Sequence, residues 1–232
     1  MNWENIKLSD NCSYFLYEGE KLFNKDFIEV LKFHSPGLAP VSDETGWYHI
    51  DVKGLPIYYN RYSRAFGYYF NRSSVIENEN WYHIDCTGKR VYKENYNWCG
   101  NYQQSVCTVR DKDNKYFHID LFGKAIYDEK YQYAGDYYDN ICCVKTKLGW
   151  KHIKLDGTDL NGKYFTDLGV FHKGFATAKD EKGWHHITKL GFPVYPERYN
   201  AIEPFYNGFA LVETCENEKI VIGENGNSFL TI

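Results

Sequence analysis

The chain has 232 residues, with 27 basic and 31 acidic side chains and a formal net charge of -4. The charges are scattered and no apolar run is long enough to cross a membrane, so neither a nucleic-acid partner nor a membrane partner is expected. No apolar stretch of signal-peptide length lies near residue 1, which favours a cytoplasmic location; a bacterial effector delivered into a host cell would have the same composition.

One short phrase recurs along the whole sequence. Close relatives of Trp-Tyr-His-Ile-Asp return with their histidines 34, 35, 34 and 34 residues apart, and the same step reaches Phe15 and Val221 at the two ends. A fixed period of this length is typical of repeat architectures. The sequence therefore predicts a single repeat domain over residues 1–232. Its seven units are centred on Phe15, His49, His83, His118, His152, His186 and Val221.

Each unit is predicted to consist of short strands joined by tight turns. In the second unit a small-x-Val strand, Ala39–Val41, comes first, and the strand that carries the phrase, 47–51, follows it. Gly54 comes five residues after the histidine and suits a turn with positive φ. A further strand leads to Tyr58. These columns predict three strands in each unit, or four if the aromatic segment before the first turn also pairs. The 22 Tyr, 15 Phe and 19 Gly agree with such a β-rich chain.

The repeated histidine is interpreted as structural. Alternation along a strand places Trp47, His49 and Asp51 on one face. We expect the imidazole to bond to backbone or to the Asp of its own or a neighbouring unit. The alternative is a ring of imidazoles at a metal or in a proton relay. A site needs one convergent set, however, and later units replace the Asp by Lys154 and Thr188. No catalytic, cofactor-binding or metal-binding residue and no cofactor is therefore predicted.

The seven cysteines follow no framework spacing and include no CxxC pair, which favours reduced thiols over disulfides or a structural zinc site. The adjacent Cys142 and Cys143 could form a vicinal redox pair. Cys142, however, falls in the small-residue column, and this favours packing for both.

Several tyrosines gather near the predicted turns. On an exposed face, tyrosine brings a large rigid surface with a polar tip, which favours binding of peptides or sugars. His34 and His172 share one aligned position close by and are interpreted as loop-tip or aromatic-replacing residues. The tyrosines are Tyr68, Tyr69, Tyr137, Tyr138 and Tyr206.

The columns "GWYHID…G…Y" and "GFATAKDEKGWHHI" resemble the bacterial WG-repeat family over about residues 13–232. The chain departs from the family pattern at Asn80, at 115–116, at Lys154 and at Thr188. The resemblance implies short β-rich repeats with a binding or scaffolding role. Such repeats occur alone or attached to catalytic domains, including methyltransferase-like ones, and the resemblance supplies no catalytic residue.

Repeat units of this size must stack to bury their apolar faces. We expect an all-β fold of seven small β-propeller-like blades; an open β-solenoid of stacked hairpins is the alternative. The predicted function is a non-enzymatic binding or scaffolding module that recognises a protein, peptide or glycan through its loop-rich face. Two alternatives remain: a substrate-recognition domain or partner of a modifying enzyme, for example a methyltransferase-like one, and an enzyme whose site lies in a central funnel.

Overall fold

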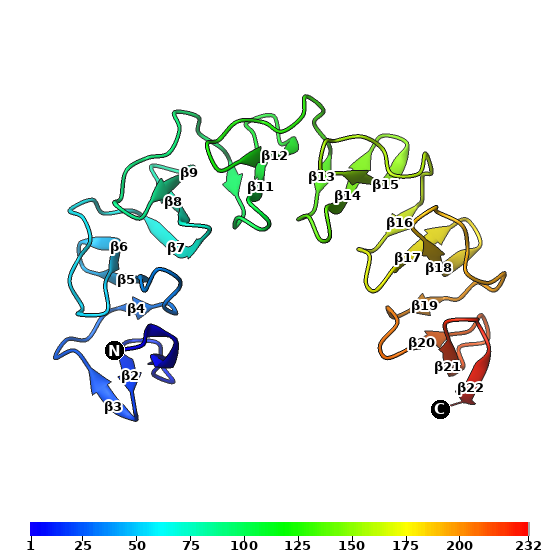
Figure 1. Ribbon diagram of the computed structural model, residues 1–232, viewed down its shortest axis with the longest axis horizontal. Helices are drawn as coiled ribbons and strands as arrows, with labels where there is room; N and C mark the ends of the chain where they lie inside the picture. Colours follow the sequence, from blue (N-terminus) through cyan, green and yellow to red (C-terminus); the bar gives the residue numbers. More distant parts are fainter. Residues whose placement is uncertain (232) are drawn as a thin grey trace. The chain divides into compact units, whose positions relative to one another are not determined.

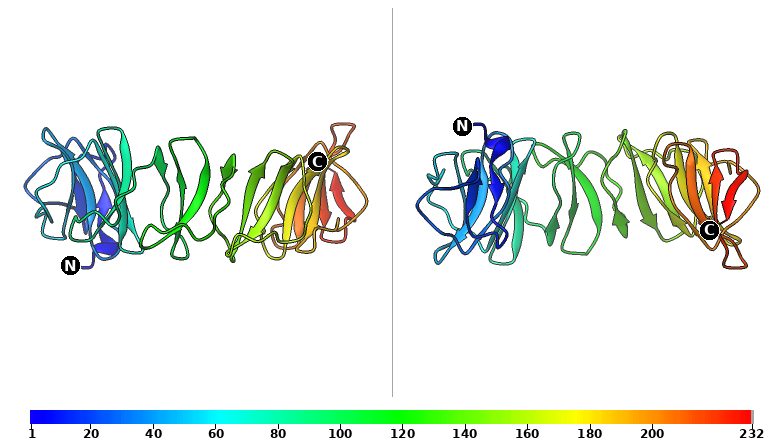
Figure 2. Two further views of the ribbon diagram at one scale, coloured as in Figure 1. Left: turned by 90° about the horizontal axis from the view of Figure 1, so that it is seen from above. Right: turned by 90° about the horizontal axis from the view of Figure 1, so that it is seen from below.

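The computed structural model describes residues 1–231, and nearly all of its regular structure is β-strand (Figure 1). Over these residues the strands form seven antiparallel sheets, which confirms the predicted all-β repeat fold. The chain divides into two compact units, Met1–Ala125 with four of the sheets and Ile126–Ile232 with the other three. Inside each unit the sheets follow one another in chain order and stand face to face (Figure 2). Within residues 1–231, no helix has the length and apolar character needed to cross a membrane.

The first compact unit begins with a short 3-10 helix, η1 (Trp3–Asn5). Its four sheets are β1 (Lys7–Leu8), β2 (Phe15–Tyr17) and β3 (Glu20–Leu22); β4 (Glu29–Val30), β5 (Ala39–Asp43) and β6 (Gly46–Ile50); β7 (Arg64–Tyr69), β8 (Arg72–Glu77) and β9 (Asn80–Asp85); and β10 (Trp98–Cys99), β11 (Val106–Arg110) and β12 (Tyr116–Asp120).

The second compact unit has the same plan. Its three sheets are β13 (Tyr133–Ala134), β14 (Ile141–Thr146) and β15 (Gly149–Lys154); β16 (Asp167–Leu168), β17 (Phe175–Asp180) and β18 (Gly183–Thr188); and β19 (Ala201–Ile202), β20 (Phe209–Glu213), β21 (Lys219–Gly223) and β22 (Ser228–Thr231).

The strand expected after the glycine turn is regular only in the first and last sheets, as β3 and β22. Elsewhere this returning segment makes isolated bridges; after β9, for example, Arg90 bridges Ile84 and Tyr96 bridges Trp81. One reason lies in the turn, where the Asp85 carboxylate accepts the N–H groups of residues 87 and 89 that could otherwise join a ladder. The aromatic segment ahead of the first turn does pair, and it supplies the first strand of the sheets that begin with β4, β7, β10, β13, β16 and β19.

The two faces of each hairpin meet different neighbours. Ala39, Val41 and Ile50 project toward the preceding sheet, where they pack with Phe15 and Phe27. The histidines lie on the opposite face and meet the following sheet. Both faces of these hairpins are therefore covered. The isoleucine after each histidine is fully buried on the first of these faces. These isoleucines are Ile50, Ile84, Ile119, Ile153 and Ile187, with Ile222 in the last unit.

The glycine of the turn after the histidine also has a packing role. Gly88 has a φ of +80°, and a Cβ there would collide with the Tyr58 ring from the preceding sheet. Gly162 has a φ of +71° but open space around it. We expect Gly162→Ala to cost about 1 kcal/mol of folding free energy from the left-handed backbone, and Gly88→Ala to cost about 2–4 kcal/mol because the ring must also move. Urea unfolding of the two variants measures the difference, and equal losses would contradict this role for Gly88.

Candidate functional site

The repeated histidine joins its own unit to the next one. The His83 ring is 1% exposed, and its Nε2 lies 3.2 Å from the carbonyl oxygen of Gly100 in the following sheet. A carbonyl oxygen only accepts, so Nε2 carries the proton and donates it. Nδ1 of the neutral ring is then an acceptor, and the Tyr92 hydroxyl, 2.5 Å away, donates to it. The His83 ring therefore has both nitrogens satisfied without a second charged group.

The same geometry recurs along the chain. His186 contacts the Tyr195 hydroxyl at 2.5 Å and the Glu203 carbonyl oxygen at 2.9 Å. In the fifth unit His152 bonds the Gly169 carbonyl oxygen at 2.9 Å, but Asn161 takes the tyrosine position and His152 Nδ1 has no partner in the part of the chain that the structure describes. His49 bonds Tyr58 and the backbone of residue 66, and His118 is fully buried at the equivalent place.

The predicted bond from histidine to backbone is confirmed, whereas the aspartates have another use. The Asp51 carboxylate accepts the N–H groups of Lys53 and Leu55 and so shapes the glycine turn. Asp120 does the same for residues 122 and 124. The Asp of the phrase therefore caps a turn, which is a local role for a short acidic side chain.

Two of the tyrosines expected near binding loops lie in the core. Tyr68 and Tyr137 are each 2% exposed, and the Tyr68 ring packs on His49 with centroids 4.6 Å apart. The Tyr68 hydroxyl donates to the Asp85 carbonyl oxygen at 3.0 Å, and Tyr137 donates to that of Lys154 at 2.9 Å. The prediction was wrong for these two because side chains alternate along the strand, so a residue next to an exposed tyrosine points between the sheets.

The first and last units carry apolar residues at the histidine position. Phe15 is fully buried, with its ring centroid 6.0 Å from Phe23 and 4.9 Å from Phe33. These are the places that Tyr58 and Tyr68 take around His49. In the last unit Val221 pairs with Leu211 across the hairpin, as His186 pairs with Thr177 in the sixth.

Burial decides the charge of the histidines. It lowers the pKa of His49, His83, His152 and His186 to about 4, against a backbone hydrogen bond that acts in the opposite direction. The rings are therefore neutral near pH 7. Over residues 1–231, no group of three or more His, Cys, Asp or Glu side chains is placed to hold a metal ion.

The adjacent cysteines pack as predicted. Cys142 is 1% exposed and Cys143 is 5% exposed, and the Cys143 thiol donates to the Gly169 carbonyl oxygen at 3.1 Å. Burial raises the pKa of both thiols, that of Cys143 to about 12. None of the seven cysteines, all of which lie within the described residues, forms a disulfide.

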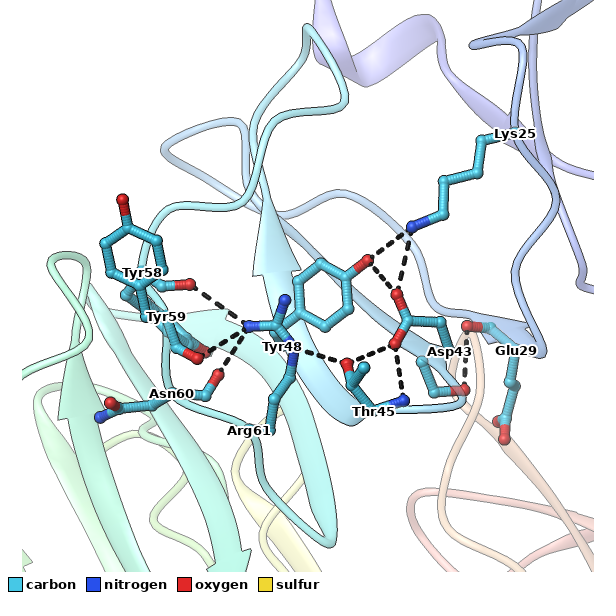
Figure 3. A network of polar contacts seen from close by, with 10 residues as sticks. Lys25, Glu29, Asp43, Thr45, Tyr48, Tyr58, Tyr59, Asn60 and Arg61 are labelled. Carbon is cyan, nitrogen blue, oxygen red and sulfur yellow. Dashed lines mark hydrogen bonds and ion pairs between the residues drawn. The ribbon is translucent and has the colours of Figure 1, made fainter.

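A polar cluster at the β5–β6 turn is fully paired (Figure 3). The Tyr48 hydroxyl donates to Asp43 at 2.8 Å, and Lys25 Nζ lies 3.1 Å from the same carboxylate. The Arg61 guanidinium stacks 3.8 Å from the Tyr48 ring centroid. Partial burial would raise the pKa of Asp43, but hydrogen bonds from Thr45, Tyr48 and Lys25 outweigh it and hold that pKa well below its usual range. Every group has a partner, so the cluster stabilises the turn rather than offering a reactive side chain.

Exposed aromatic side chains stand just before the turns that open the central hairpins, although Tyr59 and Phe122 elsewhere are more exposed. In the second compact unit, Tyr138 is 51% exposed and Tyr206 is 67% exposed. Half-buried His172 lies at the equivalent position between them in the chain. The His172 and Tyr206 ring centroids are 5.3 Å apart. We name Tyr138, His172 and Tyr206 the aromatic row. In the first compact unit, His34 and Tyr69 form a matching pair, with their ring centroids 4.8 Å apart.

The turns beside the aromatic row have a well-defined backbone. Each has two residues, with positive φ at both: 139–140, 173–174 and 207–208. Paired residues flank each turn, for example Tyr206 and Phe209. Positive φ at both central positions is the requirement of a type I′ hairpin, whose twist matches that of the strands. Proximity to predicted turns indicates all of these tyrosines, but only the register shows that Tyr69, Tyr138 and Tyr206 point outward.

No protein-family model and no curated protein matches this sequence. Among solved structures, the chain is similar to one described as the eukaryotic initiation factor, with 10% identity and a TM-score of 0.61 over 98% of this chain and 72% of that chain. It is also similar to BamB from Moraxella catarrhalis, with 12% identity and a TM-score of 0.51 over 98% and 81% of the two chains. These similarities show that the fold is β-propeller-like, as predicted, and at such low identity they show the fold alone.

Proposed function

We propose that this chain is a non-enzymatic binding module that recognises an extended protein segment through the aromatic row. The observation that carries the proposal is the row itself: Tyr138, His172 and Tyr206 are presented at one equivalent position of three successive sheets. The type I′ turns hold them before any ligand arrives, which reduces the entropy lost on binding.

The chemistry of the aromatic row suits a peptide. Tyrosine and imidazole rings offer flat apolar faces with polar edges, and they lose few rotatable bonds on contact. The neighbouring turn residues Asp139, Lys173 and Asn207 add an acid, a base and an amide, so main-chain and side-chain groups of a peptide would find donors and acceptors. A repeated spacing of rings matches a polymer in extended form better than a compact small molecule.

We also propose that the units belong to the WG-repeat family. The structure supports this with a reason for the Gly-Trp dipeptide. Gly183, with a φ of +137°, faces the Tyr199 carbonyl oxygen so closely that a Cβ would lie 2.8 Å from it. The Trp184 N–H donates to that same oxygen at 2.8 Å. Glycine thus makes room for the returning segment, and the next residue binds it.

Selection from a displayed random-peptide library, with a glycan array run in parallel, tests the proposed function. We expect peptides to be enriched, and we expect Tyr206→Ala or Tyr138→Ala to weaken their binding at least about tenfold, because exposed aromatic anchors carry most of the energy in such interfaces. Tyr164→Ala is the matched control, since Tyr164 is 43% exposed but lies on a returning segment. Enrichment of glycans alone, or equal losses in all three variants, would overturn the proposal.

A further inference from the structure

The last sheet has an outer face unlike the corresponding face of the sheets before it. Phe209 and Leu211 of β20 alternate onto this face, and Val221 and Leu230 pair beside them. The Phe229 ring packs against Phe209 with centroids 5.1 Å apart. Phe209, Phe229 and Leu230 are 44%, 62% and 59% exposed. We name these five side chains the end face. In the sixth sheet the equivalent side chains His186 and Tyr195 are 0% and 5% exposed.

The end face has lost the hydrogen-bonding pair that links one repeat unit to the next. His186 and Tyr195 stand nine residues apart and bond to each other in the sixth unit. At the same two positions the last unit has Val221 and Leu230. A valine cannot donate to a backbone carbonyl, as His186 does to that of Glu203. The end face therefore lacks the donor that His186 supplies in the sixth repeat unit, and an apolar surface complements it better than a backbone carbonyl does.

The first repeat unit shows which side chains cover such an apolar pair. Phe15 and Phe23 replace the histidine and tyrosine there, and Phe33 packs on Phe15 from the following sheet. Phenyl rings are thus the complement that this fold uses. The end face carries two exposed phenyl rings of its own, Phe209 and Phe229, beside its aliphatic pair. A second copy of the same face would supply the rings that the pair lacks.

The face at the other end of the repeat makes a poor partner for the end face. Lys7 pairs with Leu16 where Ala39 pairs with Ile50 in the next sheet, and Lys7 is exposed. Lys21 also pairs with Leu16, but its ammonium group is held in an ion pair with Asp26 at 2.6 Å. Head-to-tail stacking of copies would place the Lys7 ammonium against apolar side chains, at a cost of several kcal/mol if it is left unpaired.

The margin of the end face is compatible with self-association. Glu213 and Lys219 are paired across the hairpin and share this face, where they help line a pocket of about 200 Å³. A margin with both signs lets a two-fold arrangement place each acid near the second copy's lysine. We propose that two copies of this chain associate through their end faces in a symmetric dimer. This interaction is separate from the aromatic row and does not depend on the proposed function.

Sedimentation and light scattering of the full chain over a dilution series test the dimer. We expect a reversible dimer whose dissociation constant rises at least about tenfold in Leu230→Lys, since a charge replaces a central apolar contact. The double variant Val221→His/Leu230→Tyr rebuilds the pair of the other units, so it should fold normally and also lose the dimer. Leu148→Lys, at a turn residue that is 76% exposed, is the control and should leave the dimer intact.

Three outcomes would overturn the inference. They are a monomer at every concentration, a dimer that survives both end-face variants, and a dimer that Leu148→Lys weakens equally. Circular dichroism and thermal melting of each variant separate loss of association from loss of fold. Leu230→Lys should leave the fold intact, because Leu230 is already 59% exposed in a single chain.

Discussion

Acidification from about pH 7 to about pH 5 is expected to lower the free energy of unfolding by several kcal/mol. The pKa of His49, His83, His152 and His186 is about 4 in the folded chain, against an ordinary value of 6.5. The unfolded chain therefore binds more protons between these two values, and stability that is complete above pH 6.5 is lost as the pH falls toward 4. At about 1.4 kcal/mol per unit, each histidine contributes about 2 kcal/mol of this loss by pH 5.

Urea unfolding at a series of pH values, followed by tryptophan fluorescence, measures this loss. The window separates the histidines from the carboxylates, because hydrogen bonds lower the pKa of Asp85 and Asp180 below 3.8 despite partial burial and move their contribution to more acidic solution. Unchanged stability from pH 7 to pH 5 would show that the imidazoles are not buried in neutral form. A variant without one of the four histidines should lose about 2 kcal/mol less over the same range.

Replacing His83 by phenylalanine is expected to destabilise the chain by about 2–3 kcal/mol. The substitution keeps a buried ring but removes the donor to Gly100 and the acceptor for the Tyr92 hydroxyl, whose contact with the Cys99 thiol is long, at 3.9 Å. Tyr92→Phe alone should cost about 1–2 kcal/mol, because His83 Nδ1 loses its donor. The double variant recreates the Phe15–Phe23 arrangement of the first unit and should cost less than the sum of the two single changes.

A double-mutant cycle from urea unfolding at neutral pH gives the coupling energy. We expect at least about 1 kcal/mol of favourable coupling between positions 83 and 92. Additive losses would mean that the short contact between the ring and the hydroxyl contributes little. Position 152 offers a comparison within the same protein, because Asn161 already leaves His152 Nδ1 without a tyrosine partner among the described residues. His152→Phe should therefore cost less than His83→Phe.

Both experiments bear on the main functional conclusion. A histidine copied into successive units invites a catalytic or metal-binding interpretation, yet these rings are buried, and His83 has only a neutral hydroxyl and a backbone carbonyl as its ring-nitrogen partners at normal hydrogen-bond distance. Binding is instead proposed for the positions that repeat less strictly, where tyrosine and histidine alternate at exposed turns. In a repeat scaffold, the interior residues can be the same in every repeat unit while the exposed residues differ from one unit to the next.

The sequence by itself was sufficient for the number of units, the strand content and the structural role of the histidine. Column spacing carries that information, because every unit must place the same groups between the same two sheets. It also placed Phe15 and Val221 where histidine stands elsewhere, and it favoured packing for Cys142 and Cys143.

Only the tertiary structure decided which member of each neighbouring pair faces solvent and what each polar group contacts. The sequence alone does not distinguish Tyr68 from the adjacent Tyr69. The register of β7 places the Tyr68 side chain between two sheets and exposes that of Tyr69 to solvent. The partners of His83 lie 9 and 17 residues away in the chain, across a turn and in another sheet. Local pattern sets alternation, whereas the choice of face and of long-range partner depends on how one sheet packs on the next.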